Sequence, residues 1–270
     1  MKKKLLSTLV VLVIGLCYYF GLPIDELIAH IGGEKTIVYP VAEGIEIPQS
    51  TKKQEERILS KMNYTVAFNE KTNMPNWVAW TISKEELIER ESRTNNFQPD
   101  PALPDHIAVT TEDYTGSGYD RGHMCPAADN KFHWRAMDEC FYMTNICPQN
   151  HNLNAGVWSS LEHQCRQWAE DGHTVHVACG PIISNKAKAR YIGKEHKVRV
   201  PDAFFKVVIF GLEGTNPQAA GFVFENKAGK KDLEHYACTI DEVEKLTGID
   251  FFYRLEDDIE KRLESMITTL

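Results

Sequence analysis

Alternating apolar and polar positions predict β-strands at several places along the chain. Tyr64–Phe68 and Trp77–Ile82 alternate in this way and are separated by a turn-rich stretch. A short strand is expected at Val175–Ala178, and further strands at Phe204–Leu212 and Ala220–Asn226. The last two, close together in sequence, are expected to pair.

Apolar side chains at helical spacing predict helices between and after these strands. Asn130–Phe141 is one such segment, and Asn154–Asp171 is a second that should end at Gly172. A C-terminal helical region opens at Ile240, and Asp257–Met266 forms the last predicted helix. Strands and helices do not alternate regularly, which predicts an α+β domain built on an antiparallel sheet.

The N-terminus differs in composition from the rest of the chain. Lys2–Lys4 precede an apolar run, Leu5–Phe20, that lacks an amphipathic period. This pattern predicts an export signal, either removed or kept as a membrane anchor, because no small-x-small cleavage site follows the run. Asp25 after the run favours a domain outside the membrane. We therefore expect an exported protein, periplasmic or extracytoplasmic.

These features predict three parts. Residues 1–22 are the signal peptide or membrane anchor, 23–60 an extended linker, and 61–270 the folded domain. The net charge of −8 is mild evidence against a high-affinity DNA-binding regulator, but it leaves open an enzyme with a local positive groove. Six cysteines follow Cys17, and they either form disulfides or pack as small buried residues.

Three polar motifs lie within about forty residues and supply the parts of a phosphodiester-cleaving site. Asp120-Arg121-Gly122-His123 contains a histidine whose ordinary pKa suits a general base. Asn154 offers a hard amide oxygen for a hydrated Mg²⁺, although asparagine is also a common helix cap. Glu162 lies eight residues further, about 12 Å along a helix, and we expect it to hold a metal-bound water.

These motifs, Asp-Arg-Gly-His, Asn-Ile-x-Pro-Gln and Asn-x-Gly-x-Trp-x-x-x-Glu, resemble those of the DNA/RNA non-specific endonucleases, the family that includes endonuclease G. The resemblance extends over roughly residues 61 to 260. It implies the ββα-metal fold, in which a hairpin carries the base and a helix carries the metal ligand. It also implies Mg²⁺-dependent hydrolysis of DNA and RNA to 5′-phosphate and 3′-hydroxyl ends, with Mn²⁺ or another divalent cation as an alternative.

The resemblance also implies roles for residues outside the base and the ligand. Asn145 would orient the substrate phosphate or the base, and Gln149 would contact substrate. Arg121 either fixes its loop or contacts a phosphate. Arg93 is the candidate cation that balances the transition state, because a guanidinium can grip two phosphate oxygens. Its spacing to Phe97 departs from that of some relatives, so the nearby Arg90 is a rival.

Two other functions compete with the nuclease. A zinc-stabilised binding module would use His123, Cys125, Cys140, Cys147 and His151, whose spacing fits no compact ligand pair. An inactive relative that only binds nucleic acid is the other alternative. DNA and RNA are the expected partners, together with a membrane if the N-terminal segment is kept, and the sequence leaves the oligomeric state open.

Overall fold

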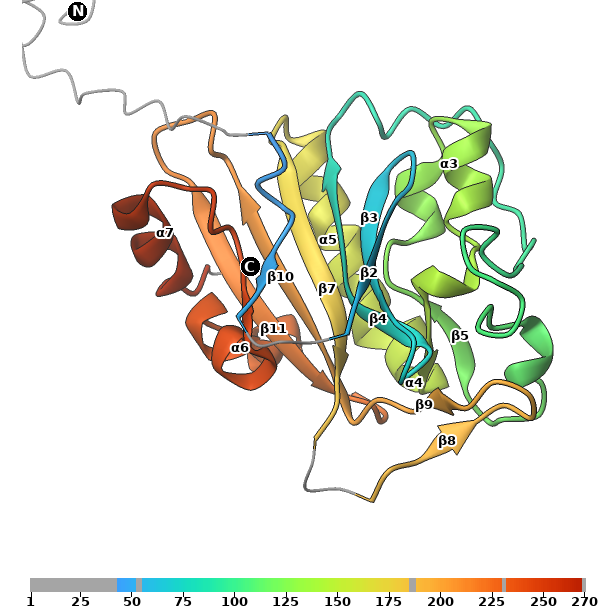
Figure 1. The fold of residues 1–270 in the computed structure, drawn as a ribbon. Coiled ribbons are helices and arrows are strands. Elements are labelled where there is room, and N and C mark those ends of the chain that lie inside the picture. The colour runs from blue at the N-terminus through green and yellow to red at the C-terminus, as the bar shows by residue number, and fades with distance from the viewer. Residues whose placement is uncertain (1–42, 52–54, 185–187, 230–231, 269–270) are drawn as a thin grey trace, which may run out of the picture. The chain divides into compact units, whose positions relative to one another are not determined.

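The structure is a computed structural model, and it describes residues 43–51, 55–184, 188–229 and 232–268 (Figure 1). The described residues all belong to one compact unit. The predicted signal or anchor, residues 1–22, lies outside the described residues. Within the described part, no helix has the length and apolar character needed to cross a membrane.

A seven-stranded sheet is the framework of this unit, and every neighbouring pair in it is antiparallel. In order across the sheet its strands are β12 (Ala237–Cys238), β11 (Gln218–Glu225), β10 (Ala203–Phe210), β7 (Val175–Ile182), β4 (Met74–Ile82), β3 (Tyr64–Asn69) and β2 (Arg57–Ser60). All five strands predicted from alternation are present, and β10 pairs with β11 as expected.

The two faces of the sheet are buried in separate hydrophobic cores because successive side chains point to opposite faces. On β7, Val177 belongs to one core and the neighbouring Ala178 to the other. The first core includes residues of α5 (Ser159–Glu170), and the second includes residues of α6 (Ile240–Thr247) and α7 (Asp257–Glu264). Figure 1 shows α5 on one side of the sheet and both C-terminal helices on the other.

A short two-stranded ribbon packs on the α5 face. It consists of β5 (Asp120–His123) and β6 (Ile146–Gln149), which are antiparallel. Between them the chain forms the 3₁₀ turns η2 (Ala127–Asn130) and η3 (Met143–Asn145) around α3 (Trp134–Glu139). The order of ribbon and following helix is therefore the expected β–β–α arrangement.

The helix predicted at Asn154–Asp171 begins irregularly. After α4 (His151–Leu153), residues Asn154–Trp158 form a π turn, η4, in which Gly156 has the non-helical angles φ −106° and ψ −120°. The regular helix α5 then starts at Ser159. Single π turns inside helices are frequent at functional positions, and this one contains the predicted metal ligand.

Several smaller elements complete the fold. β1 (Gln49–Ser50) pairs with β13 (Ile249–Asp250), and β8 (Tyr191–Ile192) pairs with β9 (Val198–Arg199). The short 3₁₀ turns η1 (Thr111–Asp113) and η5 (Leu233–Tyr236) lie in connections. Both β1 and β2 fall in the segment 23–60 that was expected to be a linker, so its described part contributes strands rather than a free tether.

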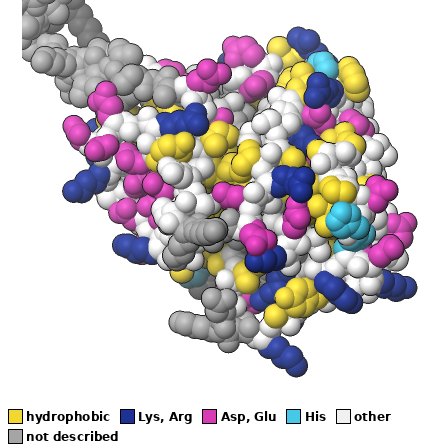
Figure 2. Space-filling view, viewed as in Figure 1, with side chains coloured by type: hydrophobic (Ala, Val, Ile, Leu, Met, Phe, Trp, Pro, Cys, Tyr) yellow, Lys and Arg dark blue, Asp and Glu magenta, His cyan; other side chains and the backbone are white. Residues whose placement is uncertain are grey.

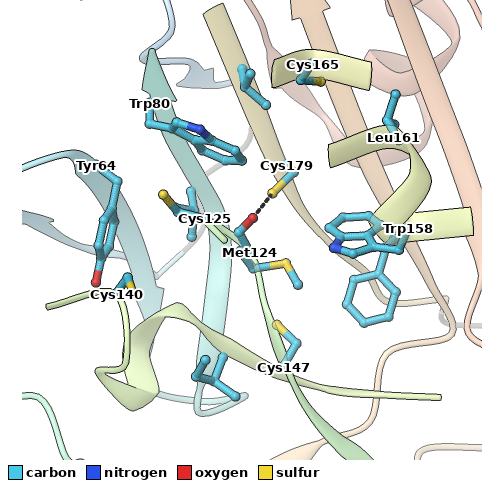
Figure 3. Packing of buried hydrophobic residues seen from close by; sticks show 14 of the residues in the cluster. Tyr64, Trp80, Met124, Cys125, Cys140, Cys147, Trp158, Leu161, Cys165 and Cys179 are labelled. Carbon is cyan, nitrogen blue, oxygen red and sulfur yellow. Dashed lines mark hydrogen bonds between the residues drawn. The ribbon is translucent and has the colours of Figure 1, made fainter. Parts of the chain in front are cut away.

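The six cysteines of the described residues are all free thiols. Five are buried, and Figure 3 shows several of them packed among Trp80, Trp158 and Leu161 in the core beneath α5. The Cys179 thiol points at the Met124 carbonyl oxygen, 3.4 Å away. The alternative in which these cysteines are small packing residues therefore describes the structure.

Candidate active site

His123 is the last residue of β5 and lies opposite Ile146 of β6. Its side chain is buried, with the residue 7% exposed. The imidazole contacts two aromatic rings, Phe97 at a centroid distance of 5.3 Å and Phe141 at 4.9 Å edge to face. These two contacts hold the imidazole ring in place, and neither phenylalanine can neutralise a positive charge on it.

This environment keeps the imidazole neutral. Burial, followed by the positive charges of Arg93 and Arg121, lowers the pKa of His123 to about 3. Within the described structure its Nε2 atom is buried and has no hydrogen-bond partner. A neutral, unpartnered imidazole nitrogen can accept a proton, which is what a general base requires.

Two arginines are held near His123 by the same aromatic rings. The Arg121 guanidinium lies 4.4 Å from the centre of the Phe97 ring, and that of Arg93 lies 5.7 Å from the Phe141 ring. Both residues are exposed, so their charges are accessible to an anion. The charges that lower the His123 pKa come from Arg93 and Arg121. The structure thus favours Arg93 over Arg90.

Asn154 is oriented by Asp120, at the other end of β5. The Asn154 side-chain Nδ2 donates to Asp120 Oδ2 at 2.9 Å, and His151 Nδ1 lies 2.9 Å from the same oxygen. Since the amide nitrogen is engaged, the amide oxygen of Asn154 is turned away from Asp120. The structure therefore fixes the rotamer that presents oxygen, the donor atom that a hard cation prefers.

An open pocket of about 410 Å³ borders Asp120, Arg121 and Asn154. Its walls also include Phe97, Tyr119 and residues of the segment 111–116. The open volume beside Asp120 and Asn154 leaves room for water. The donor set fits a largely hydrated divalent cation, which needs only one or two protein oxygens. Asn154 is the residue that would hold it, and Asp120 orients the Asn154 amide.

Glu162 lies on α5 in a partly buried group of charges. Burial raises the pKa of Glu162 to about 7, opposed by Lys206 and Arg166 and reinforced by Asp129. Asp129 accepts hydrogen bonds from the Trp80 indole at 3.0 Å and from Arg166 at 2.9 Å. Glu162 is thus tied electrostatically to charges in the core rather than being a freely solvated helix carboxylate.

Lys206 of β10 is the centre of this charge group. It is 1% exposed, and its ammonium lies 4.3 Å from the Trp158 ring centre and 5.3 Å from that of Trp80. Nζ has no hydrogen-bond partner among the described residues, so the rings and the nearby carboxylates compensate its charge. Burial alone would lower the pKa of Lys206, but acidic groups including Glu162 and Asp129 leave it above its ordinary value.

Asn145 and Gln149 occupy buried positions instead of the pocket surface. Both are 0% exposed. Asn145 accepts a hydrogen bond from the Cys125 N–H at 2.9 Å and donates to the Cys125 and Cys140 carbonyls, each at 2.8 Å. It therefore fixes the main chain directly after His123, which agrees with a base-orienting role and not with a phosphate contact.

The Gln149 side chain packs against Gly122 across the ribbon. A Cβ at position 122 would lie 2.2 Å from Gln149 Oε1 and 2.6 Å from its Cβ, so only glycine fits beside this side chain. Its burial does not support the substrate contact predicted for Gln149. The Gln149 side chain instead sets the spacing of β5 and β6, and this spacing fixes the position of His123.

Several residues of the site were not identified from the sequence. The contacts that Lys206, Phe97 and Phe141 make in the site gave no signal, because a lone lysine in a strand or a lone phenylalanine is ordinary; Phe97 served only as the spacing reference for Arg93. Asp129 did give a sequence signal, because it is a carboxylate that directly follows the apolar residues 124–128 and so breaks the pattern of a buried segment. Tyr119, which directly precedes the Asp-Arg-Gly-His motif, also lines the pocket.

The zinc alternative is not supported by the geometry. Among the described residues, the groups of three or more potential ligating side chains that come close together consist of carboxylates and contain no cysteine or histidine. Cys125 instead accepts a hydrogen bond from Asn130 Nδ2 at 3.3 Å, and the Cys140 thiol donates to the Met137 carbonyl at 3.1 Å.

A two-stranded ribbon carrying a buried neutral histidine, followed by a helix whose first turn presents an oriented asparagine, defines the ββα-metal class of nuclease sites. Comparison with known proteins agrees. The family model described as DNA/RNA non-specific endonuclease matches residues 42–258, and the chain belongs to this family. The predicted family is therefore confirmed.

Relatives of known name support the assignment. The chain is 36% identical to mouse mitochondrial nuclease EXOG, over 72% of this chain and 56% of that protein. It is 34% identical to mitochondrial Nuclease 1 of Schizosaccharomyces pombe and 32% identical to the mitochondrial nuclease of Saccharomyces cerevisiae, in each case over 76% of this chain and 68% of the relative. The chain thus spans little more than half the length of the EXOG relative.

A solved structure matches the fold. A chain in the crystal structure of the EndoG/EndoGI complex superimposes with a TM-score of 0.66 at 24% identity, covering 74% of this chain and 87% of that one. The predicted α+β, ββα-metal fold class is confirmed by this match.

The prediction of an exported, periplasmic or extracytoplasmic protein is wrong. The relatives named above from mouse and the two yeasts are mitochondrial nucleases, which conflicts with export. The physical reason for the error is that lysines followed by an apolar run report only an affinity for some membrane or translocation machinery. They do not specify which compartment lies beyond it.

Proposed function

We propose that this protein is a Mg²⁺-dependent endonuclease that hydrolyses phosphodiester bonds in DNA and RNA. One observation carries the proposal: a buried, neutral His123 lies near two accessible guanidinium groups, on the same strand as the Asp120 that orients Asn154. The family and the named nucleases among its relatives support the same activity.

In the proposed reaction, His123 accepts a proton from the attacking water, and the guanidinium groups of Arg93 and Arg121 bind oxygens of the scissile phosphate. In the protein without substrate, the pKa of His123 is too low for the imidazole to be a strong base. Binding of the phosphate changes this. An anion on the two arginines offsets the charges that depress this pKa, so substrate binding raises the basicity of the ring. When bound, the divalent cation stabilises negative charge on the phosphate and the leaving oxygen.

The remaining site residues act through others. Asn145 holds the backbone after His123, and Gln149 sets the ribbon spacing beside Gly122. Glu162 is proposed to hold water in the hydration shell of the cation, in its ionised form. Asp120 positions Asn154.

The test is cleavage of plasmid DNA and of a long RNA by the full chain, with Mg²⁺ titrated against excess EDTA. His123→Ala should lower turnover on both substrates at least about 100-fold, the usual minimum for loss of a general base. His106→Ala is the matched control, because His106 is an exposed histidine. Turnover that persists in EDTA, or a His123→Ala variant as active as His106→Ala, would refute the proposal.

A further inference from the structure

Five carboxylates converge on the face of the sheet opposite the ribbon. Asp241 and Glu244 come from α6, Asp250 from β13, and Glu260 and Glu264 from α7. They form two overlapping groups that share Glu264, and within each group the ligating atoms lie within 4.8 Å of one another. Figure 2 shows acidic side chains gathered over the side of the molecule where α6 and α7 lie.

Glu264 is the centre of this carboxylate cluster and is the member whose environment requires explanation. The residue is only 7% exposed, and its Oε1 atom is buried without a hydrogen-bond partner among the described residues. The Glu264 carboxyl does approach the Glu244 side chain closely enough for a hydrogen bond, which opposes the burial-raised pKa of Glu244. Glu244, by comparison, uses its own Oε1 to accept the Phe251 N–H at 2.8 Å. A buried, unpartnered carboxylate oxygen is costly, and native structures usually satisfy such atoms with a hydrogen bond, a water or an ion.

The charges around Glu264 make the cost larger. Burial raises the pKa of Glu264 to about 9, and the charges that add to this are all acidic, in the order Glu244, Glu260, Asp241 and Asp250. Burial and the neighbouring acids also raise the pKa of Glu260 to about 7. A cation bound among these carboxylates would relieve their mutual repulsion and supply a partner for the buried Glu264 oxygen.

We propose that this carboxylate cluster binds Ca²⁺, with Glu264 as the shared ligand that fastens α7 to α6 and β13. Calcium binds carboxylate oxygens at about 2.4 Å, so two oxygens on one ion can lie up to about 4.8 Å apart, and the oxygens of each group lie within this limit. Calcium also accepts six to eight oxygen ligands in irregular geometry, which suits a site made of several carboxylates better than the strict octahedral geometry of Mg²⁺ does. The site is independent of the proposed nuclease chemistry.

The experiment measures Ca²⁺ binding by calorimetry and by thermal unfolding of the full chain carrying Asn154→Ala, which removes the proposed catalytic ligand. A site with Kd of about 10 µM is in about 100-fold excess ligand at about 1 mM Ca²⁺. The melting temperature should then rise by about 5–10 °C. Adding Glu264→Gln should abolish this rise. Asp258→Asn, which neutralises an exposed acid on the same helix, should leave it intact.

Glutamine preserves the shape of Glu264 and removes repulsion, so the metal-free Glu264→Gln protein should melt no lower than its parent. A second variant, Glu260→Gln, should weaken Ca²⁺ binding at least about tenfold. It tests the proposal by itself if Glu264→Gln does not fold. The proposal fails if the parent shows no Ca²⁺-dependent rise, or if both glutamine variants keep a rise as large as the parent's. It also fails if acidification stabilises the parent while Ca²⁺ does not, since the cluster would then hold protons only.

Discussion

Glu162, rather than His123, should set the acid side of the pH–activity profile. The pKa of His123 is about 3, so its ionisation does not change between about pH 6 and pH 8. The pKa of Glu162 is about 7, and its proposed role requires the carboxylate. Activity should therefore fall as the pH drops through this pKa, because Glu162 takes up a proton.

The size of the effect follows from the pKa. With a pKa of about 7, Glu162 is about 91% ionised at about pH 8 and about 9% ionised at about pH 6, so kcat/KM should fall about tenfold between them. Glu162→Gln should be less active and should lose this dependence. Glu170→Gln, an exposed acid on the same helix, should keep both the activity and the midpoint of the parent.

Lys206→Met shifts the same midpoint in a predictable direction. The positive charge of Lys206 is the largest of the influences that lower the pKa of Glu162, so its removal should move the acid limb to higher pH. Methionine keeps much of the stem packed against Trp158 and Trp80. Loss of a buried charge next to Asp129 should nevertheless cost about 3–5 kcal/mol of folding free energy. Thermal unfolding therefore accompanies each rate measurement.

The assay is the initial rate of cleavage of a short fluorogenic duplex under kcat/KM conditions, at constant ionic strength and saturating Mg²⁺. Such a profile reports ionisations of the free enzyme. The reasoning is refuted if Glu162→Gln retains an acid limb with the parent's midpoint, or if Lys206→Met moves that midpoint to lower pH.

Three further predictions concern the ribbon and the pocket. Arg93→Ala should lower kcat/KM at least about 100-fold and Arg90→Ala less than about threefold, measured on the same duplex; equal losses would contradict the assignment. Asn154→Ala should raise the Mg²⁺ concentration needed for half-maximal rate at least about tenfold, and an unchanged requirement would exclude it as ligand. Gly122→Ala should lower the melting temperature by about 2–12 °C through its clash with Gln149, and Gln149→Ala in the same chain should recover part of the loss.

The sequence predicted the sheet well because its signal is local. Alternation in β3 and β4 and the apolar strands β7, β10 and β11 followed directly from residue order. The helix boundary at Asn154 could not be predicted in the same way. A π turn depends on the local backbone at Gly156 and on the hydrogen bond from Asn154 to Asp120, thirty-four residues away.

The candidate site shows the same limit. His123 and Asn154 are recognisable because their motifs are contiguous in sequence. Lys206 is not, since its function depends on the two tryptophans and the carboxylates that the sheet and α5 bring around it. Burial of Gln149 was missed for a related reason, because its environment is set by the register of β5 against β6.

Burial acts in opposite directions on the two titrating groups of the site. Low polarity disfavours the charged imidazolium and so lowers the pKa of His123, whereas it disfavours the charged carboxylate and so raises the pKa of Glu162. The nearby cations reinforce the first shift and oppose the second, which keeps the base neutral while leaving Glu162 able to ionise near neutral pH. Substrate then reverses only the first effect, because its phosphate offsets Arg93 and Arg121 and not Lys206.

The base is thus weak in the free protein and strengthens when an anion occupies the pocket. A phosphate analogue should therefore raise the pKa of His123 without raising that of Glu162 by a similar amount. A histidine-selective NMR titration with and without the analogue would measure the first change, and an unshifted His123 would argue against the two guanidinium groups acting on the phosphate.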